Sequence, residues 1–318
     1  MKKIIFLIFL GIILIFSGCS GNNGSFLGSN NDKTGAVEED ITGDGLSISF
    51  SVDDNEILSK KIIYEFSISN SGKDIVEVSR KNINLITIQK MNDGTAIFTE
   101  DSLNNFYNKI FSDGDLNLVQ NQEKSGIGGI LEIKPEYFNN INNEKVDYVL
   151  SMNYDYKTHF SNNVKLDLKA NSGNKFQILD KLSQAAPVKI TNIELENGPS
   201  NDEYVLVFNI EDKNSFLSDE KSIVKFNNIE LNFRSQNLNN CKYYIKENGF
   251  NKEISFENFV LNNKNKELVL KCLVNLQENK DESINTMISG QLTYNYKFEI
   301  ERTTNFPNNR IAENSNWN

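Results

Sequence analysis

The chain has 318 residues, a net charge of −10 and a mean hydropathy of −0.45. An acidic chain without a cluster of Lys and Arg repels polyanions, which excludes nucleic acid as an expected partner. A chain of this length can build two hydrophobic cores, so two domains are the natural expectation.

The first 18 residues have the pattern of an export signal. Lys2 and Lys3 precede an uncharged apolar run, Ile4 to Phe16, and small residues follow it. Thirteen residues rise about 20 Å as an α-helix, whereas a bilayer core is about 30 Å thick. We therefore expect a signal peptide over 1–18, with an uncleaved anchor as the open alternative. Removal of Lys2 and Lys3 would take the net charge from −10 to −12.

Phe16-Ser17-Gly18-Cys19 resembles the lipobox of prokaryotic lipoproteins. The resemblance implies a lipid such as palmitate on the Cys19 thiol and a cut just before this residue, which then becomes the acylated N-terminus. Two or more acyl chains hold a protein stably, because each buried CH₂ contributes about 0.8 kcal/mol. The implied location is the extracytoplasmic face of a cell membrane. The alternative is an ordinary secretory signal with an incidental cysteine.

The body of the chain has the rhythm of β-strands. Residues 19–45 lack periodicity and are expected to form a disordered tether. From Leu46 onward apolar and polar residues alternate, and turn residues separate seven or eight short strands as far as residue 170. One segment, Thr99 to Phe111, has apolar residues at helical spacing behind a capping residue and predicts a short helix.

The second half of the chain repeats the first. Residues 62–68 match 204–210 at an offset of 142, and the Tyr154/Tyr156 pair matches Tyr294/Tyr296 at an offset of 140. Such a repeat indicates a duplicated β-domain. We expect a linker over 171–186 with a helical turn at Phe176 to Leu182, a second domain over 187–301 and a disordered tail over 302–318.

The segment FSISNSGKDIVEV, residues 66–78, is similar to the opening of immunoglobulin-like modules found in tandem on prokaryotic surface proteins. This resemblance implies an all-β fold with two tandem immunoglobulin-like antiparallel β-sandwich domains, over 46–170 and 187–301. The chain departs from that family in one respect. Its only tryptophan, Trp317, lies in the tail instead of a core strand.

Cys241 and Cys272 are the two cysteines of the second repeat. An even number of cysteines in an exported chain favours a disulfide between them. An Asn-Gly turn at Asn248-Gly249 could fold neighbouring strands back between them. A redox pair or a metal site is the alternative, although the single histidine, His159, leaves few further soft ligands.

No catalytic, metal or cofactor site is expected. His159 has no nucleophile motif near it, and the paired tyrosines are interpreted either as an aromatic ligand platform or as core residues. The chain is therefore expected to be a non-enzymatic cell-surface lipoprotein that acts as a structural, adhesive or protein-interaction module. The alternative is an accessory lipoprotein of a transporter or envelope complex that binds a glycan or solute. The partner, protein or glycan, is not identified by the sequence.

Overall fold

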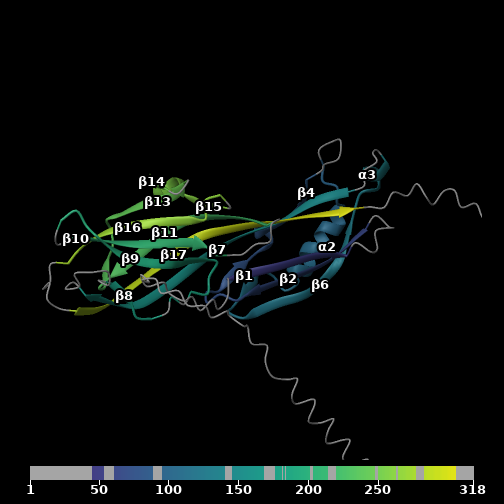
Figure 1. Ribbon diagram of the computed structural model, residues 1–318. Helices are drawn as coiled ribbons and strands as arrows, with labels where there is room; N and C mark the ends of the chain where they lie inside the picture. Colours follow the sequence, from purple (N-terminus) through teal and green to yellow (C-terminus); the bar gives the residue numbers. More distant parts are fainter. Residues whose placement is uncertain are drawn as a thin grey trace, which may run out of the picture. The chain divides into compact units, whose positions relative to one another are not determined.

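The computed structural model describes residues 45–53, 61–88, 95–139, 145–167, 176–180, 182, 184–200, 203–213, 220–247, 250–262, 264–276 and 283–305. These residues form an all-β fold of several sheets, as predicted (Figure 1). The strands of the first half are β1 (Leu46–Asp53), β2 (Lys61–Asn70), β3 (Val76–Val78), β4 (Ile83–Thr87), β5 (Leu116–Leu118), β6 (Gln122–Glu132), β7 (Lys145–Asp167) and β8 (Phe176–Ile178). Two α-helices, α2 (Glu100–Ile110) and α3 (Pro135–Asn139), and the 3₁₀ turn η2 (Arg80–Asn82) accompany them.

The strands of the second half are β9 (Val188–Asn197), β10 (Glu203–Asp212), β11 (Glu220–Phe233), β12 (Gln236–Asn237), β13 (Cys241–Glu247), β14 (Phe250–Ile254), β15 (Val260–Asn262), β16 (Glu267–Asn275) and β17 (Ser283–Asn305), with the 3₁₀ turn η3 (Phe256–Asn258). The sheets have the strand orders β1-β2-β6, β14-β13-β16-β10-β9, β12-β11-β17-β7-β4 and β3-β5. In the third of these, β15 also pairs with β11 and β8 with β7, which makes seven strands.

The pairing of β7 with β17 is the longest in the fold. The two strands run antiparallel side by side, from Lys145 opposite Asn305 to Asp167 opposite Ser283 (Figure 1). β7 belongs to the first repeat and β17 to the second, so their seven-stranded sheet takes strands from both halves. The buried apolar side chains of both halves likewise form one hydrophobic cluster. The two halves on either side of the linker expected over 171–186 therefore share one sheet and one core.

The strand registers match the sequence repeat. Ile48 lies opposite Ile68 across β1 and β2, and the residues 142 further on, Ile190 and Ile210, lie opposite each other across β9 and β10. In the shared sheet β4 pairs with β7 as β11 pairs with β17, although Ile83 opposite Met152 corresponds to Ile229 opposite Leu292 only at different offsets, 146 and 140. Equivalent strands thus make equivalent pairs in the two halves.

A local two-fold axis relates β7 to β17. Tyr154 lies opposite Tyr296. At the repeat offset of 140, Tyr154 corresponds to Tyr294 and Tyr296 corresponds to Tyr156, and these two residues also lie opposite each other. Asp155 and Asn295 lie between them and exchange places under this operation. The Asn295 amide donates a hydrogen bond of 3.1 Å to the Asp155 carboxylate at this centre. This is the isologous arrangement of a symmetric dimer, here within one chain.

The four tyrosines of this centre are core residues, which resolves the two interpretations of the sequence. All four are buried, and rings from different halves pack at 5.5 Å (Tyr154 with Tyr296) and 6.0 Å (Tyr156 with Tyr294) between centroids. Burial raises the pKa of Tyr154 and Tyr294 well above the ordinary value, so both phenols stay neutral in the fold. Rings enclosed in this way offer no ligand platform.

Two local expectations have opposite outcomes. The helix expected over Thr99 to Phe111 is confirmed as α2, with the Thr99 hydroxyl accepting the Ser102 N–H at 3.3 Å. The helical turn expected at Phe176 to Leu182 is wrong, because Phe176–Ile178 form β8 and pair with residues 164–166 of β7. The open edge of β7 supplies hydrogen-bond partners there that a single helical turn would lack.

The structure describes two ends of the predicted segments, the start of the first domain and the start of the tail. β1 begins at Leu46, where the first domain was expected to start. β17 continues through Asn305, so the first four residues of the tail expected over 302–318 are strand. Residues 1–44 and 306–318 lie outside the described residues.

We predict one cooperative unfolding transition for the two halves, because they share a sheet and a core. In differential scanning calorimetry the van't Hoff and calorimetric enthalpies of the folded part should agree. Tyr294→Ala should cost about 3–5 kcal/mol and lower the midpoint of the whole transition. Two transitions, of which this variant shifts only one, would show that the halves unfold independently.

We predict opposite effects for two phenylalanine substitutions in the tyrosine centre. The Tyr154 hydroxyl is buried and has no hydrogen-bond partner in the described part of the chain, so Tyr154→Phe should be neutral or stabilising by up to about 1 kcal/mol. The Tyr296 hydroxyl donates to Asp212 at 3.2 Å, so Tyr296→Phe should cost about 1–3 kcal/mol. Urea unfolding of both variants measures this difference, and equal losses would contradict it.

Candidate functional site

The site residues expected from the sequence lie partly within and partly outside the described part of the chain. Cys19 and its lipobox lie outside the described residues, so lipidation stays a prediction. Cys241 on β13 and Cys272 on β16 lie directly opposite each other and are joined in a disulfide. Both sulfurs are used in this bridge. Within the described ranges no group of three or more His, Cys, Asp or Glu side chains could hold a metal ion.

His159 lies within β7, opposite Gln291 of β17. Its Nε2 is 3.6 Å from a carboxylate oxygen of Asp74, and its side chain is about half exposed. Among the hydrogen bonds of the described residues, none joins a Ser or Cys nucleophile to this imidazole. The geometry therefore contains a His–Asp contact but not the chain of nucleophile, base and orienting group that acyl transfer requires.

The two halves differ most where one helix is replaced by a hairpin. The first half places α2 between β4 and β5, whereas the second half places β12, β13 and β14 between the equivalent strands β11 and β15. The register of β6 on β2 puts Gly129 at the position of Cys272, so the first half has no equivalent disulfide. A feature that only one copy of a duplicated fold carries is not required by the shared architecture. This segment is therefore where a copy-specific function is best sought.

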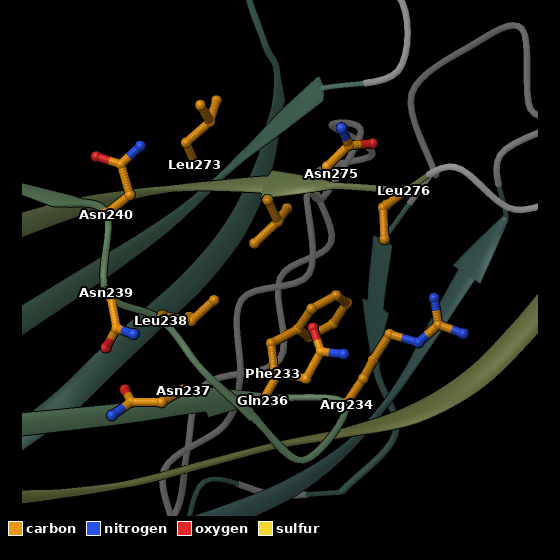
Figure 2. A pocket seen from close by; sticks show the side chains of 11 residues that line it. Phe233, Arg234, Gln236, Asn237, Leu238, Asn239, Asn240, Leu273, Asn275 and Leu276 are labelled. Atoms are coloured by element: carbon orange, nitrogen blue, oxygen red, sulfur yellow. The ribbon is translucent and has the colours of Figure 1, made fainter.

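A groove of about 730 Å³ lies beside this hairpin. We call it the amide groove; it is lined by Phe233, Arg234, Gln236, Asn237, Leu238, Asn239, Asn240, Leu273, Val274, Asn275 and Leu276. Figure 2 shows Phe233, Gln236 and Asn237 on one wall and, on the other, Leu273 and Asn275 with side chains that point away from the Phe233 ring. Its walls thus come from the β11–β12–β13 connection and from the end of β16.

The polar lining of the amide groove is of one chemical kind. Among the described lining residues, five side chains are primary amides, Arg234 is the one cation, and none carries a carboxylate. The five amides are solvent-exposed, and none of them forms a side-chain hydrogen bond within the part of the chain that the structure describes. Each primary amide offers two donors and an acceptor. The groove therefore presents many unused hydrogen-bonding groups in a chain that is otherwise acidic.

The turn that presents Arg234 is strained. β11 and β12 are joined by Arg234 and Ser235 alone, and Phe233 pairs with Gln236. Both turn residues have positive φ, 55° and 61°, the signs of a type I′ turn. Such a turn favours Asn and Gly, and other residues in this region cost about 1–3 kcal/mol each. The Arg234 N–H donates to the Met287 carbonyl at 3.1 Å, which holds the turn against β17.

The opposite wall is fixed to the sheet by main-chain bonds and by the disulfide. The Leu273 N–H donates to the Asn240 carbonyl at 3.0 Å, next to the Cys241–Cys272 bridge. The Leu238 N–H donates to the Leu231 carbonyl at 2.8 Å. These bonds hold the Leu238–Asn240 segment between β11 and β16. A groove with both walls held in place loses little conformational entropy when it binds a ligand.

A second hollow lies along α2 and is a weaker candidate. Its polar lining includes Asp101, Lys109 and Glu132, and the Lys109 amine donates to the Gly128 carbonyl at 2.5 Å. Glu132 pairs with Lys61 at 2.8 Å. Lys109 thus holds the helix to β6, and Glu132 links β6 to β2.

Sequence reasoning identified the disulfide partners but missed the amide groove. The signal for the Arg234-Ser235 turn was hidden, because it contains neither Asn-Gly nor any other glycine. The run QNLNN, residues 236–240, was the one available indication, because amide residues close together in the sequence can gather on one surface. Abundant asparagine elsewhere in the chain made this run inconspicuous.

No protein-family model matches the chain, and no curated protein sequence matches it. Among solved structures, the envelope protein VP37 of White Spot Syndrome Virus is similar over 44% of this chain and 98% of that chain, with 14% identity and a TM-score of 0.22. The collagen adhesin of S. aureus (10% identity, 84% of each chain, TM-score 0.12) and the collagen-binding domain of Erysipelothrix rhusiopathiae surface protein RspB (10% identity, 84% and 88%, TM-score 0.11) are also similar.

These likenesses are too low to carry an argument on fold family or function. Within the described residues, no helix has the length and apolar character needed to cross a bilayer. Because the comparisons carry no argument, the candidate site rests on the geometry of the amide groove alone.

We predict that the Cys241–Cys272 bridge stabilises the fold by about 3–4 kcal/mol, because it closes a loop of 31 residues in the unfolded chain. The double variant Cys241→Ser/Cys272→Ala should lose this amount in urea unfolding. A reducing agent should lower the stability of the natural chain equally and leave the variant unchanged. Equal stability of the natural chain with and without reductant would contradict the prediction.

Proposed function

We propose that this chain is a cell-surface lipoprotein, held by lipid on Cys19 at the extracytoplasmic face of a cell membrane. It displays a non-catalytic β-structure that serves as a structural, adhesive or protein-interaction module. The observation that carries the proposal is the motif Phe16-Ser17-Gly18-Cys19 directly after a charge-free apolar run. The polar residues that follow Cys19 give the folded part reach from the lipid surface.

The disulfide supports export. Disulfides persist in oxidising compartments and are rare in the cytosol of most organisms. The Cys241–Cys272 bridge joins neighbouring strands of the second half. A chain with this bridge fits an extracytoplasmic location better than a reducing one.

We further infer that the two halves are immunoglobulin-like β-sandwich modules in tandem, fused side by side through β7 and β17. The matching registers of β1–β2 with β9–β10 and of β4–β7 with β11–β17 support a duplication of one β-module. Antiparallel pairing with short connections is the usual architecture of such sandwiches. The lipid anchor then displays both modules at the cell surface as one unit.

We predict that labelled palmitate enters the chain through Cys19. Cells that produce the natural chain should show a labelled protein in the membrane fraction, and mass spectrometry should find acylated Cys19 at its N-terminus. Cys19→Ala should abolish the label and the processing. The matched control is Cys241→Ser/Cys272→Ala, which should keep the label. An unlabelled natural chain in the cytosolic fraction would overturn the anchor.

A further inference from the structure

We propose that the first half of the chain binds a short extended peptide with a basic side chain, which adds a strand to the open edge of β6. The site is the hollow along α2, which has a volume of about 770 Å³. The inference deepens the protein-interaction role proposed above and rests on it. It does not depend on the lipid anchor, so a failed binding test would leave the anchor unaffected.

The edge of β6 that faces away from β2 has main-chain groups without partners. The Gly128 carbonyl accepts the Lys109 amine of α2 at 2.5 Å (Figure 1). The Glu132 carbonyl accepts the Thr99 N–H at 2.9 Å, so alternate residues of β6 direct their main-chain groups to this edge. Ile130 lies between them, is 47% exposed, and has no partner at this edge within the described part of the chain. An exposed, unpaired strand edge is a template for another strand.

The second half of the chain shows that the equivalent edge accepts a strand. Ile130 of β6 corresponds to Leu273 of β16, because their cross-strand partners, Ile63 and Val205, are equivalent in the repeat. β13 pairs with β16 at this edge, and the Leu273 N–H donates to the Asn240 carbonyl at 3.0 Å. The first half thus has a hollow where the second half has a paired strand.

Gly128 is not required by the fold of the described residues. A Cβ at Gly129 would lie 2.5 Å from the Tyr64 hydroxyl oxygen, and Gly126 has a φ of 68°, so both of these positions need glycine. A Cβ at Gly128 would meet only the Tyr64 carbonyl oxygen, at the ordinary distance of 3.7 Å. Glycine inside a strand weakens it and often marks a place where another backbone approaches closely. Gly128 therefore favours the approach of a peptide beside Ile130.

The charged side chains of the hollow favour a basic peptide. Asp101, in the first turn of α2, is exposed, and its carboxylate has no hydrogen bond or ion pair within the described ranges. Lys109 is held by the Gly128 carbonyl, and Glu132 pairs with Lys61. Asp101 is therefore the charged group of the described lining that remains for a Lys or Arg of the peptide. The net charge of −10 adds a long-range attraction for a basic segment.

Fluorescence anisotropy on the full chain in detergent micelles tests the proposal with labelled peptides at constant ionic strength. The probe is acetyl-TVKVT-amide, and its acidic counterpart is acetyl-TVEVT-amide. We expect the basic peptide to bind and the acidic peptide to bind about tenfold more weakly, because it meets Asp101 with a like charge.

A series of the basic peptide with one N-methyl group at each position in turn reports the strand pairing. Since alternate N–H groups of an added strand face β6, binding should be lost at alternate positions and kept at the others. Equal effects at all positions would contradict pairing at the edge.

Ile130→Pro removes an N–H that the proposal needs, whereas the matched control Ile130→Ala removes the side chain and keeps this N–H. Proline is tolerated on an edge strand where its N–H would face away from the sheet. Ile130→Pro should weaken binding about tenfold or more, and Ile130→Ala less than about threefold. The unfolding temperatures of both variants report whether the fold is intact, and the N-methyl series decides the question if Ile130→Pro does not fold.

Asp101→Asn should weaken binding of the basic peptide about fivefold, whereas Asp115→Asn, at an exposed position outside the hollow, should leave it unchanged. The proposal fails if the basic peptide does not bind the natural chain, or if a folded Ile130→Pro variant binds it as the natural chain does. Equal affinity for the acidic and the basic peptide would overturn the assignment of a basic partner.

Discussion

The pairing of β7 with β17 is the interaction on which the rest of the molecule depends. Its 23 residue pairs place β7 of the first repeat against β17 of the second. Two tyrosines from each strand bury their rings at the centre of this pairing, so main-chain hydrogen bonds and aromatic packing act at the same place. β4 and β8 of the first half and β11, β12 and β15 of the second belong to the same sheet, and the other described strands form separate sheets.

Duplication explains which features are shared and which are not. Both halves repeat the registers needed to enclose a core, and those positions are occupied by apolar side chains in both. They differ at α2, which closes the core of the first half with Phe106 and Ile110, and at the β13–β14 hairpin of the second. α2 packs its buried side chains into the core, whereas β13 extends a sheet by pairing with β16. The hairpin alone brings a disulfide with it.

The sequence predicted those parts of the fold whose signals are local. Alternation identified β1 and β2, the Thr99 cap identified α2, and the even cysteine count identified the bridge. The length of β7 could not be predicted, because its second part, around Asn162 and Asn163, is polar and becomes a strand through its partner β17. The prediction of a helical turn at Phe176 to Leu182 was wrong for a similar reason. Phe176–Ile178 form a strand by pairing with the edge of β7, and this tertiary contact has no local signal in the sequence.

The near-symmetry of β7 and β17 also has a consequence during synthesis of the chain. Because β17 repeats the pattern of β7, the β7 of one polypeptide is able to pair with the β7 of a second before β17 has emerged. Exchange of equivalent elements between identical chains is a low-cost route to dimers, and misassembly of neighbouring repeats is a characteristic hazard of duplicated proteins. The differences between the strands, such as Asp155 where β17 has Asn295, work against this exchange. Two aspartates at the centre of a β7–β7 pair would repel, whereas the Asp155–Asn295 pair forms a hydrogen bond.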